Sequence, residues 1–151
     1  MRTLQVTARI AGCSPTDAYR ALCDFARYED VAEAVRRVSV DRRPDGTATS
    51  TWEVDFRDGI MAWTEIDEFD EAAARIVFTQ IDGDFEQFAG SWEVGADGDG
   101  ALIEFNAAFD IGIPSLGAII EPLAERTLRE NVAQILRGLL GDGVELVGAT
   151  H

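Results

Sequence analysis

The chain is poor in the residues that most often carry catalysis and metal binding. Its only histidine is His151, the last of 151 residues, which excludes a mechanism with an internal histidine base or an imidazole metal ligand. The two cysteines, Cys13 and Cys23, provide neither a disulfide framework nor a complete structural metal site. We therefore expect two reduced thiols, no metal and no cofactor.

Long apolar runs and an excess of positive charge are missing as well. No window approaches the roughly 18 apolar residues of a membrane span, and the N-terminal MRTLQVTARI alternates like a strand, unlike a secretory signal. With 28 acidic and 13 basic residues, the net charge of −15 repels nucleic acid and anionic lipid. We expect a cytoplasmic protein without membrane or nucleic-acid partners. A neutral or apolar ligand, or a basic partner, remains open.

The N-terminal part of the sequence contains signals for one strand and two short helices. Residues 3–10 alternate in hydropathy, which is typical of a strand. The sequence SPTD at 14–17 is typical of a helix start, with the serine as N-cap, the proline at the first helical position and the aspartate closing a capping-box variant. This helix is expected to run to about Cys23. A second short helix fits Tyr28 to Val35.

Six further strands and one long helix are predicted from the remaining pattern. The expected strands are RVSVDR, ATSTWEVDF, IMAWTEIDEF, RIVFTQI, FEQFAGSWEV and ALIEFNAAFDI. An Asp-Gly or Gly-rich turn precedes the second, third, fifth and sixth of them. A wide apolar stripe of period 3.6 follows from Leu116 to Leu139, with the main helix expected from about Pro122 to Leu140. We expect one α+β domain over 1–151, with 144–151 as a flexible tail. A seven-stranded antiparallel sheet would wrap around the C-terminal helix and leave a hollow between them.

The segment AWTEIDEFD, residues 62–70, combines two aromatic residues with four acids. In a strand, Trp63, Glu65 and Asp67 point to the same face. If this face lines the hollow, burial beside aromatic rings raises the pKa of the carboxyl groups, which suits a general acid or base near neutral pH. The alternative is that the opposite face is buried and the acids lie in water. A shift of one residue decides between the two.

Four segments resemble the helix-grip fold of the START and pollen-allergen superfamily. They are VTARIAGCSPTDAYRALCDFARYEDV, IDGDFEQFAGSWEV with Asp84 in place of a proline, GALIEFNAAFDI and LRENVAQI. The last two are similar to the final strand and helix of the polyketide aromatase/cyclases, and coenzyme Q-binding relatives share the hairpin. The resemblance implies an internal cavity in which a poly-β-ketone is cyclised by aldol condensation and dehydration, as in antibiotic biosynthesis. It also makes an acyl carrier protein a candidate partner.

The resemblance further implies residues with particular roles. An arginine would hold or polarise a carbonyl or enolate from the strand AWTEIDEF, but positions 65–68 of this chain are Glu-Ile-Asp-Glu, so the cation is missing. Asn131 matches an asparagine in the last helix of the cyclases, which favours a ligand-facing role. A hydrogen bond across the core is the alternative for this amide. Tyr28 resembles an aromatic gate at the mouth of the cavity.

Further candidate ligand contacts come from the predicted strand faces and the last helix. The aromatic candidates are Trp52, Trp63, Phe78, Phe88 and Trp92. Gln80 is a candidate inward-facing donor, and Thr127 lies beside Asn131 on the helix stripe. Aromatic residues at sheet spacing are more often plain core than ligand contacts, but in a helix-grip hollow the two roles overlap.

Two classes of function follow from these residues. The first is a cofactor-independent polyketide cyclase that uses Glu65 or Asp67 as the acid–base group, with Asn131 orienting the carbonyl. The second is a binding protein that carries or shields a quinone, lipid or polyketide without turnover. The missing arginine and histidine favour the binder, and the acid pair with the inward asparagine favours the enzyme, which is our preferred hypothesis. A hollow filled with side chains would instead favour a protein-interaction role through the acidic surface.

Overall fold

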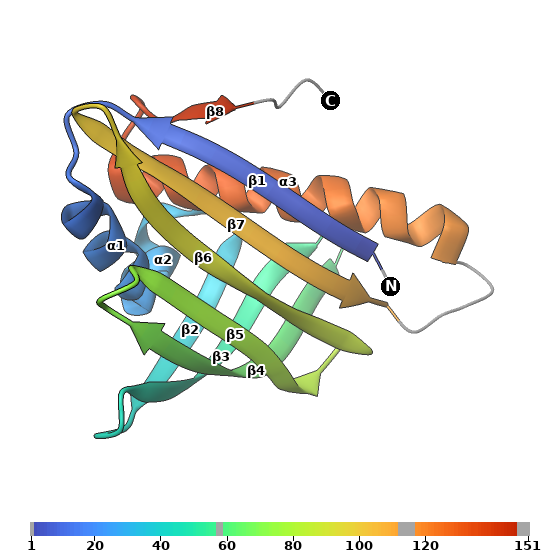
Figure 1. The fold of residues 1–151 in the computed structure, drawn as a ribbon. Helices are drawn as coiled ribbons and strands as arrows, with labels where there is room; N and C mark the ends of the chain where they lie inside the picture. Colours follow the sequence, from blue (N-terminus) through green and yellow to red (C-terminus); the bar gives the residue numbers. More distant parts are fainter. Residues whose placement is uncertain (1, 57–58, 112–116, 148–151) are drawn as a thin grey trace.

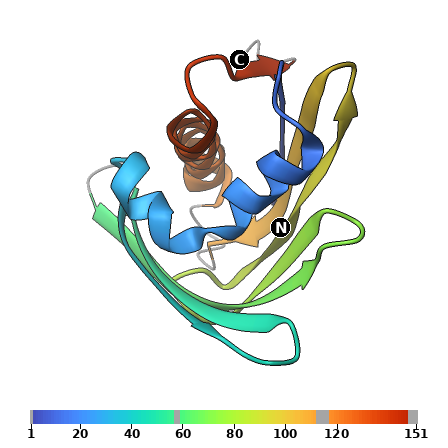
Figure 2. The same cartoon turned by 90° about the vertical axis from the view of Figure 1, so that its left-hand side faces the viewer.

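The computed structural model describes residues 2–56, 59–111 and 117–147, in which an antiparallel sheet curves around one long helix (Figures 1 and 2). The strands are β1 (Arg2–Ile10), β2 (Val35–Arg42), β3 (Thr47–Phe56), β4 (Gly59–Asp70), β5 (Arg75–Gly83), β6 (Gln87–Asp97), β7 (Gly100–Asp110) and β8 (Glu145–Val147). The helices are α1 (Pro15–Cys23), α2 (Tyr28–Val31) and α3 (Gly117–Leu140), with a 3-10 turn at Phe25–Arg27 before α2. This is the helix-grip architecture expected from the sequence.

Sheet order and helix position together create the hollow. The strands lie in the order β2-β3-β4-β5-β6-β7-β1-β8, and each strand is antiparallel to its neighbours. α3 runs along the concave face, while α1 and α2 cover one end, as Figure 2 shows. One face of α3 is buried there because Leu128, Val132, Leu136 and Leu139 recur at helical spacing.

The first two helices begin and end for local reasons. Ser14 Oγ accepts a hydrogen bond from the backbone N–H of Asp17 at 3.1 Å, and Pro15 occupies the first turn, so the predicted start of α1 is confirmed. α1 ends at Cys23, also as predicted. The second helix is shorter than predicted, since α2 ends at Val31 and β2 already begins at Val35. The valines of this region favour an extended chain over a helix.

The C-terminal part differs from the prediction in two places. α3 begins at Gly117 and contains Pro122, so the helix continues through the proline that was expected to start it, at the loss of one backbone hydrogen bond. The sheet has eight strands and not seven, since β8, expected to belong to a flexible tail, pairs with β1 next to the buried Val144. The predicted stripe residue Leu116 and the tail residues 148–151 lie outside the described residues.

None of the described helices combines the length and the apolar character that a membrane span requires.

Gly90 in β6 marks a close approach between three strands. A Cβ at this position would overlap the backbone oxygen of Asn106 in β7 and would lie 2.8 Å from Cζ of Phe78 in β5. Both strands are paired with β6 at this point, so neither can move without disturbing the sheet.

We expect Gly90→Ala to lower the free energy of unfolding by about 1–3 kcal/mol, because the added methyl group overpacks this contact. Urea denaturation of both proteins measures the change. Gly95→Ala is the matched control in the same strand, since no atom lies within 4 Å of the Cβ added there. Equal losses in the two variants would contradict this explanation of Gly90.

Candidate functional site

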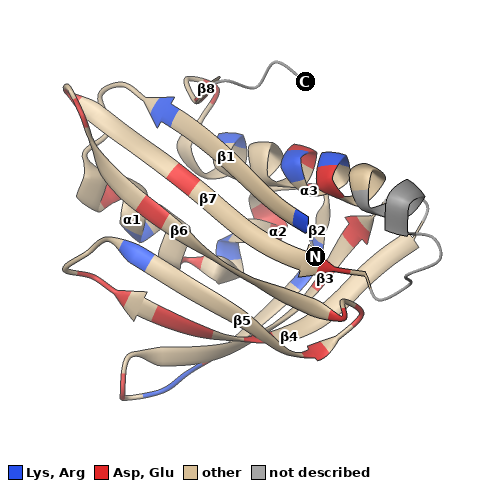
Figure 3. Ribbon diagram, turned by 45° about the vertical axis from the view of Figure 1, so that its right-hand side comes forward, with Lys and Arg blue, Asp and Glu red and all other residues tan. Residues whose placement is uncertain are grey.

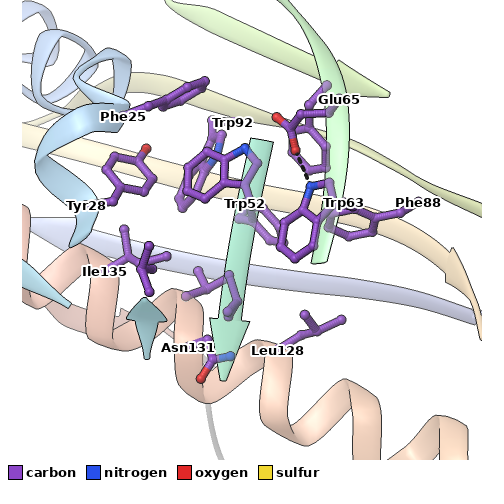
Figure 4. A pocket seen from close by; sticks show the side chains of 15 residues that line it. Phe25, Tyr28, Trp52, Trp63, Glu65, Phe88, Trp92, Leu128, Asn131 and Ile135 are labelled. Atoms are coloured by element: carbon purple, nitrogen blue, oxygen red, sulfur yellow. Dashed lines mark hydrogen bonds between the residues drawn. The ribbon is translucent and has the colours of Figure 1, made fainter. Parts of the chain in front are cut away.

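A cavity of about 80 Å³ lies between the concave face of the sheet and α3. Its walls are aromatic and aliphatic apart from Glu65 and Asn131, and they include all three tryptophans of the chain. The lining residues are Phe25, Tyr28, Val35, Trp52, Val54, Trp63, Glu65, Phe78, Phe88, Trp92, Phe105, Leu128, Asn131, Val132 and Ile135. Figure 4 shows Glu65 above the tryptophan rings and Asn131 on α3 below them.

The acidic face of β4 points inward. Trp63, Glu65 and Asp67 are 8%, 4% and 0% exposed, whereas Ile66 between the two acids is 36% exposed. Trp63 and Glu65 line the cavity. Asp67, two residues further along the strand, is buried on the same face but does not line the cavity. The alternative orientation, with the acids in water, is thereby excluded.

Hydrogen bonds from tryptophan and serine side chains satisfy the two carboxyl groups. Trp63 Nε1 donates to Glu65 Oε1 at 2.7 Å, the bond drawn in Figure 4. Ser50 Oγ donates to Asp67 Oδ2 at 2.5 Å, and Trp52 Nε1 donates in turn to Ser50 Oγ at 2.8 Å. The network spans β3 and β4, where Ser50 and Glu65 are register partners.

Burial determines the protonation of this pair. It raises the pKa of Glu65 well above the usual value, and the hydrogen bond and negative charge of Asp67 raise this pKa further. Burial also raises the pKa of Asp67, but hydrogen bonds from Glu65 and Ser50 and the charge of Arg42 oppose this shift. Asp67 Oδ1 is buried without another partner, which fits a hydrogen bond from a protonated Glu65. Of the two carboxyl groups, Glu65 at the cavity surface is therefore the one that keeps its proton.

The two polar candidates on α3 have different surroundings. Asn131 lines the cavity, and its Nδ2 donates to the backbone oxygen of Asp55 at 3.0 Å, which ties α3 to the end of β3. Asn131 thus makes a hydrogen bond across the core, although to a backbone oxygen and not to the strand side chain or buried water considered as an alternative, and it also borders the cavity. Thr127 Oγ1 donates to the Leu123 carbonyl at 3.1 Å within its own helix, and it does not line the cavity.

Gln80 and Tyr28 have structural partners that spacing alone did not reveal. Gln80 Nε2 donates to the Phe85 carbonyl at 2.9 Å, so it stabilises the β5–β6 turn and lies outside the cavity lining. Tyr28 lines the cavity but is 1% exposed, and its hydroxyl donates to the Leu22 carbonyl at 2.6 Å. In the structure this side chain is therefore a buried part of the cavity wall, and the gate role implied by the resemblance stays a prediction.

The contributors that the sequence analysis missed include Phe25, Phe105 and Ser50. Phe25, in the turn before α2, lines the cavity beside Tyr28, and Ser50 binds Asp67. Ser50 shares an inward face with Trp52 and Val54 at a spacing of two, so the strand pattern carried a signal for it. Phe25 belongs to an irregular turn, where no periodicity indicates the buried face.

The available chemistry is that of carboxyl groups, hydroxyls and indoles. The sequence contains no lysine, so a Schiff-base mechanism is excluded. Among residues 2–56, 59–111 and 117–147, no group of three or more His, Cys, Asp or Glu side chains is arranged to hold a metal ion.

The structure is similar to several solved structures over nearly the whole chain. TTHA0849 from Thermus thermophilus has a TM-score of 0.84 at 24% identity, covering 91% of this chain and 94% of that one. The Zhui aromatase/cyclase from Streptomyces sp. R1128 has a TM-score of 0.80 at 16% identity, covering 94% and 93%. A START superfamily protein from Mycobacterium smegmatis has a TM-score of 0.76 at 18% identity, covering 90% and 94%. At these identities the likeness establishes the fold alone.

Sequence comparison identifies the family. A search among curated proteins found no match. The family model described as "Polyketide cyclase / dehydrase and lipid transport" matches residues 12–136, which include the cavity lining from Phe25 to Ile135. The chain therefore belongs to the polyketide cyclase/dehydrase and lipid transport family.

Proposed function

We propose that the chain binds an apolar polyketide-like ligand in the cavity and promotes its cyclisation and dehydration, with Glu65 as the proton donor. One observation carries this proposal: Glu65 is a buried carboxylic acid, with a raised pKa, at the surface of an aromatic cavity. Perturbed acids that face a cavity are candidates for acid–base catalysis. Family membership and the aromatase/cyclase among the similar structures support a cyclase-like or ligand-binding role.

In the proposed aldol step, one proton passes from Glu65 to the ligand and one proton returns from the ligand to Glu65. The enol carbon of the ligand forms a bond to a carbonyl carbon, and the carbonyl oxygen takes the proton of Glu65. The enol oxygen loses its own proton as it becomes a ketone, and this proton restores Glu65. In the dehydration, Glu65 protonates the departing hydroxyl as water, and the proton lost from the adjacent carbon returns to the carboxylate.

Asp67 acts through Glu65 and has no contact with the ligand in this mechanism. Its negative charge and hydrogen bond help to keep the proton on Glu65, and Ser50 holds Asp67 in place. A neutral acid thus takes the position where similar cyclases are expected to have a cation. It can polarise a carbonyl by hydrogen bonding and can also deliver a proton, which an arginine does not do.

A carrier function is the second candidate, and the engaged amide of Asn131 favours it. Ligand cavities commonly have volumes of about 300–1,000 Å³, and the one here is about 80 Å³. Aromatic side chains must therefore move before a ring system fits. A cavity that adapts to apolar ligands is sufficient for transport, and the donor group of Asn131 is already engaged by Asp55.

Glu65→Gln should lower the rate of cyclised product formation by about 10²–10⁴-fold, because the amide keeps the shape but cannot exchange the proton. Turnover of a poly-β-ketone thioester, followed by mass spectrometry and absorbance, measures the effect. Glu68→Gln is the matched control, since Glu68 lies on the exposed face of the same strand and its replacement should leave the rate unchanged. Unchanged turnover in both Glu65→Gln and Asp67→Asn would rule out the carboxylate mechanism. Recovery of only unaltered ligand from the wild-type protein would indicate a carrier.

The proton on Glu65 also predicts a pH dependence of stability. Because the folded state raises the pKa of Glu65, it binds more protons than the unfolded state above about pH 4.3, the ordinary pKa of glutamate. The stability of the wild type should therefore fall, relative to Glu65→Gln, as the pH rises from there to the raised pKa. Urea denaturation of both proteins across this pH range measures the difference. Parallel pH profiles would contradict a protonated Glu65.

A further inference from the structure

A second pocket, of about 350 Å³, lies between α1, the β2–β3 hairpin and the end of β4. Its lining carries three arginines and one glutamate, in a chain whose net charge is −15. The lining residues are Tyr19, Arg20, Cys23, Arg42, Arg43, Gly46, Thr47, Phe69 and Glu71. Figure 3 shows acidic residues along several strands of the sheet.

The positive charge of the pocket is not neutralised by ion pairs. Arg36 and Arg75, elsewhere on the sheet, pair with Asp55 and Glu93. In the described part of the chain, by contrast, no carboxylate lies within 4 Å of a guanidinium nitrogen of the three pocket arginines. All three are exposed, so their charges are available to a ligand.

Two of these arginines are held in place by the fold. Arg42 Nη2 donates to the Cys23 carbonyl at 2.7 Å, at the end of α1, and its guanidinium carbon lies 4.9 Å from the centre of the Phe69 ring. Arg43 donates to the hydroxyls of Thr47 and Thr49. Each guanidinium has further N–H groups, and a preorganised fork loses less entropy when it binds an anion.

Tyr19 adds a buried hydroxyl that lacks a hydrogen-bond partner. The residue is 5% exposed and lines the pocket, and its oxygen is buried without a hydrogen bond in the described residues. The Cys23 thiol lies beside it, but a thiol is only a weak partner. Burial raises the pKa of Tyr19, so the hydroxyl stays protonated and can donate. An unpaired buried donor is unfavourable, and an acceptor in the pocket would satisfy it.

A single aromatic contact separates this pocket from the cavity. Phe69 lines the pocket, Phe25 lines the cavity, and their ring centres are 5.6 Å apart. These rings are in contact, so a chain can reach the tryptophan-lined cavity from the pocket only if the two side chains move apart.

We propose that the pocket of Arg20, Arg42, Arg43 and Tyr19 binds the phosphate or carboxylate group of an amphipathic ligand whose apolar part occupies the cavity. The proposal rests on ligand binding in the cavity, as proposed above, and does not depend on catalysis by Glu65. The charged group stays among the arginines at the surface, where bidentate hydrogen bonds to guanidinium groups hold it. The apolar part passes the Phe25–Phe69 contact.

The test compares octyl phosphate, octanoate and octanol as probes of equal chain length. All three tryptophans line the cavity, so a change in the intensity or wavelength of tryptophan emission reports that the octyl chain has entered it. At least one anionic probe should bind about tenfold more tightly than octanol, and the better of the two identifies the group as phosphate or carboxylate. Inorganic phosphate or acetate should compete with that probe without itself changing the tryptophan emission.

Charge-matched variants separate this site from general electrostatics. The double variant Arg42→Gln, Arg43→Gln should lose most of the anionic preference, while Arg36→Gln, Arg37→Gln on the same strand removes equal charge outside the pocket and should keep it. Tyr19→Phe, which preserves the shape, should weaken only the anionic probes. Equal binding of the three probes, or equal losses in the two double variants, would overturn the proposal. If none of the three probes changes the tryptophan emission, ligand binding in the cavity itself, which is part of the proposed function, is contradicted.

Discussion

The alternation of side chains along β4 determines the chemistry of the cavity. Since residues two apart share a face, the strand cannot bury Trp63 in the hollow without burying Glu65 and Asp67 as well. Two adjacent buried charges would be very unfavourable. The pair avoids this by keeping a proton on Glu65, while Asp67 takes the hydrogen bond from Ser50 and the favourable field of Arg42. A proton donor inside an apolar cavity is thus a consequence of the pleat, and the proposed reaction uses it.

The same indole rings form the apolar wall and supply the hydrogen bonds of the acid network. Trp52 and Trp63 are stacked, with ring centres 6.1 Å apart and planes at 10°, and each N–H points away from the stack to an oxygen of the network. The bond from Trp63 favours the charged form of Glu65 and so lowers its pKa. Because the cavity is small, a bound ring system has to displace such side chains. If the proposed ligand displaced Trp63, this bond would be lost and Glu65 would hold its proton more strongly, which would couple ligand binding to acid strength.

Periodicity was sufficient to predict the strands, the long helix and the hollow, because hydropathy at a spacing of two or 3.6 directly reflects which face is buried. It also identified most of the aromatic cavity wall and the two acids. It could not identify hydrogen-bond partners, which depend on neighbours that are distant in sequence. Thr127 and Gln80 have the inward direction that spacing predicts, yet the first bonds its own helix and the second holds a turn. β8 was missed because three residues carry too little pattern to distinguish a strand from a tail.

The distribution of charge limits how a ligand can lie in this fold. An anionic group beside Glu65 would be desolvated next to the charge of Asp67, so the cavity can accept only a neutral part of a ligand. The strongly acidic chain also repels a free anion, except at the basic pocket between α1 and the β2–β3 hairpin. A ligand with one acidic group would therefore keep this group at Arg42 and Arg43 and direct its neutral end past Phe25 towards Glu65. In such a pose, the carbonyl that lies at the right distance from the charged end is the one that reaches Glu65. This distance would let the protein select one ketone among several equivalent ketones along the chain of the ligand.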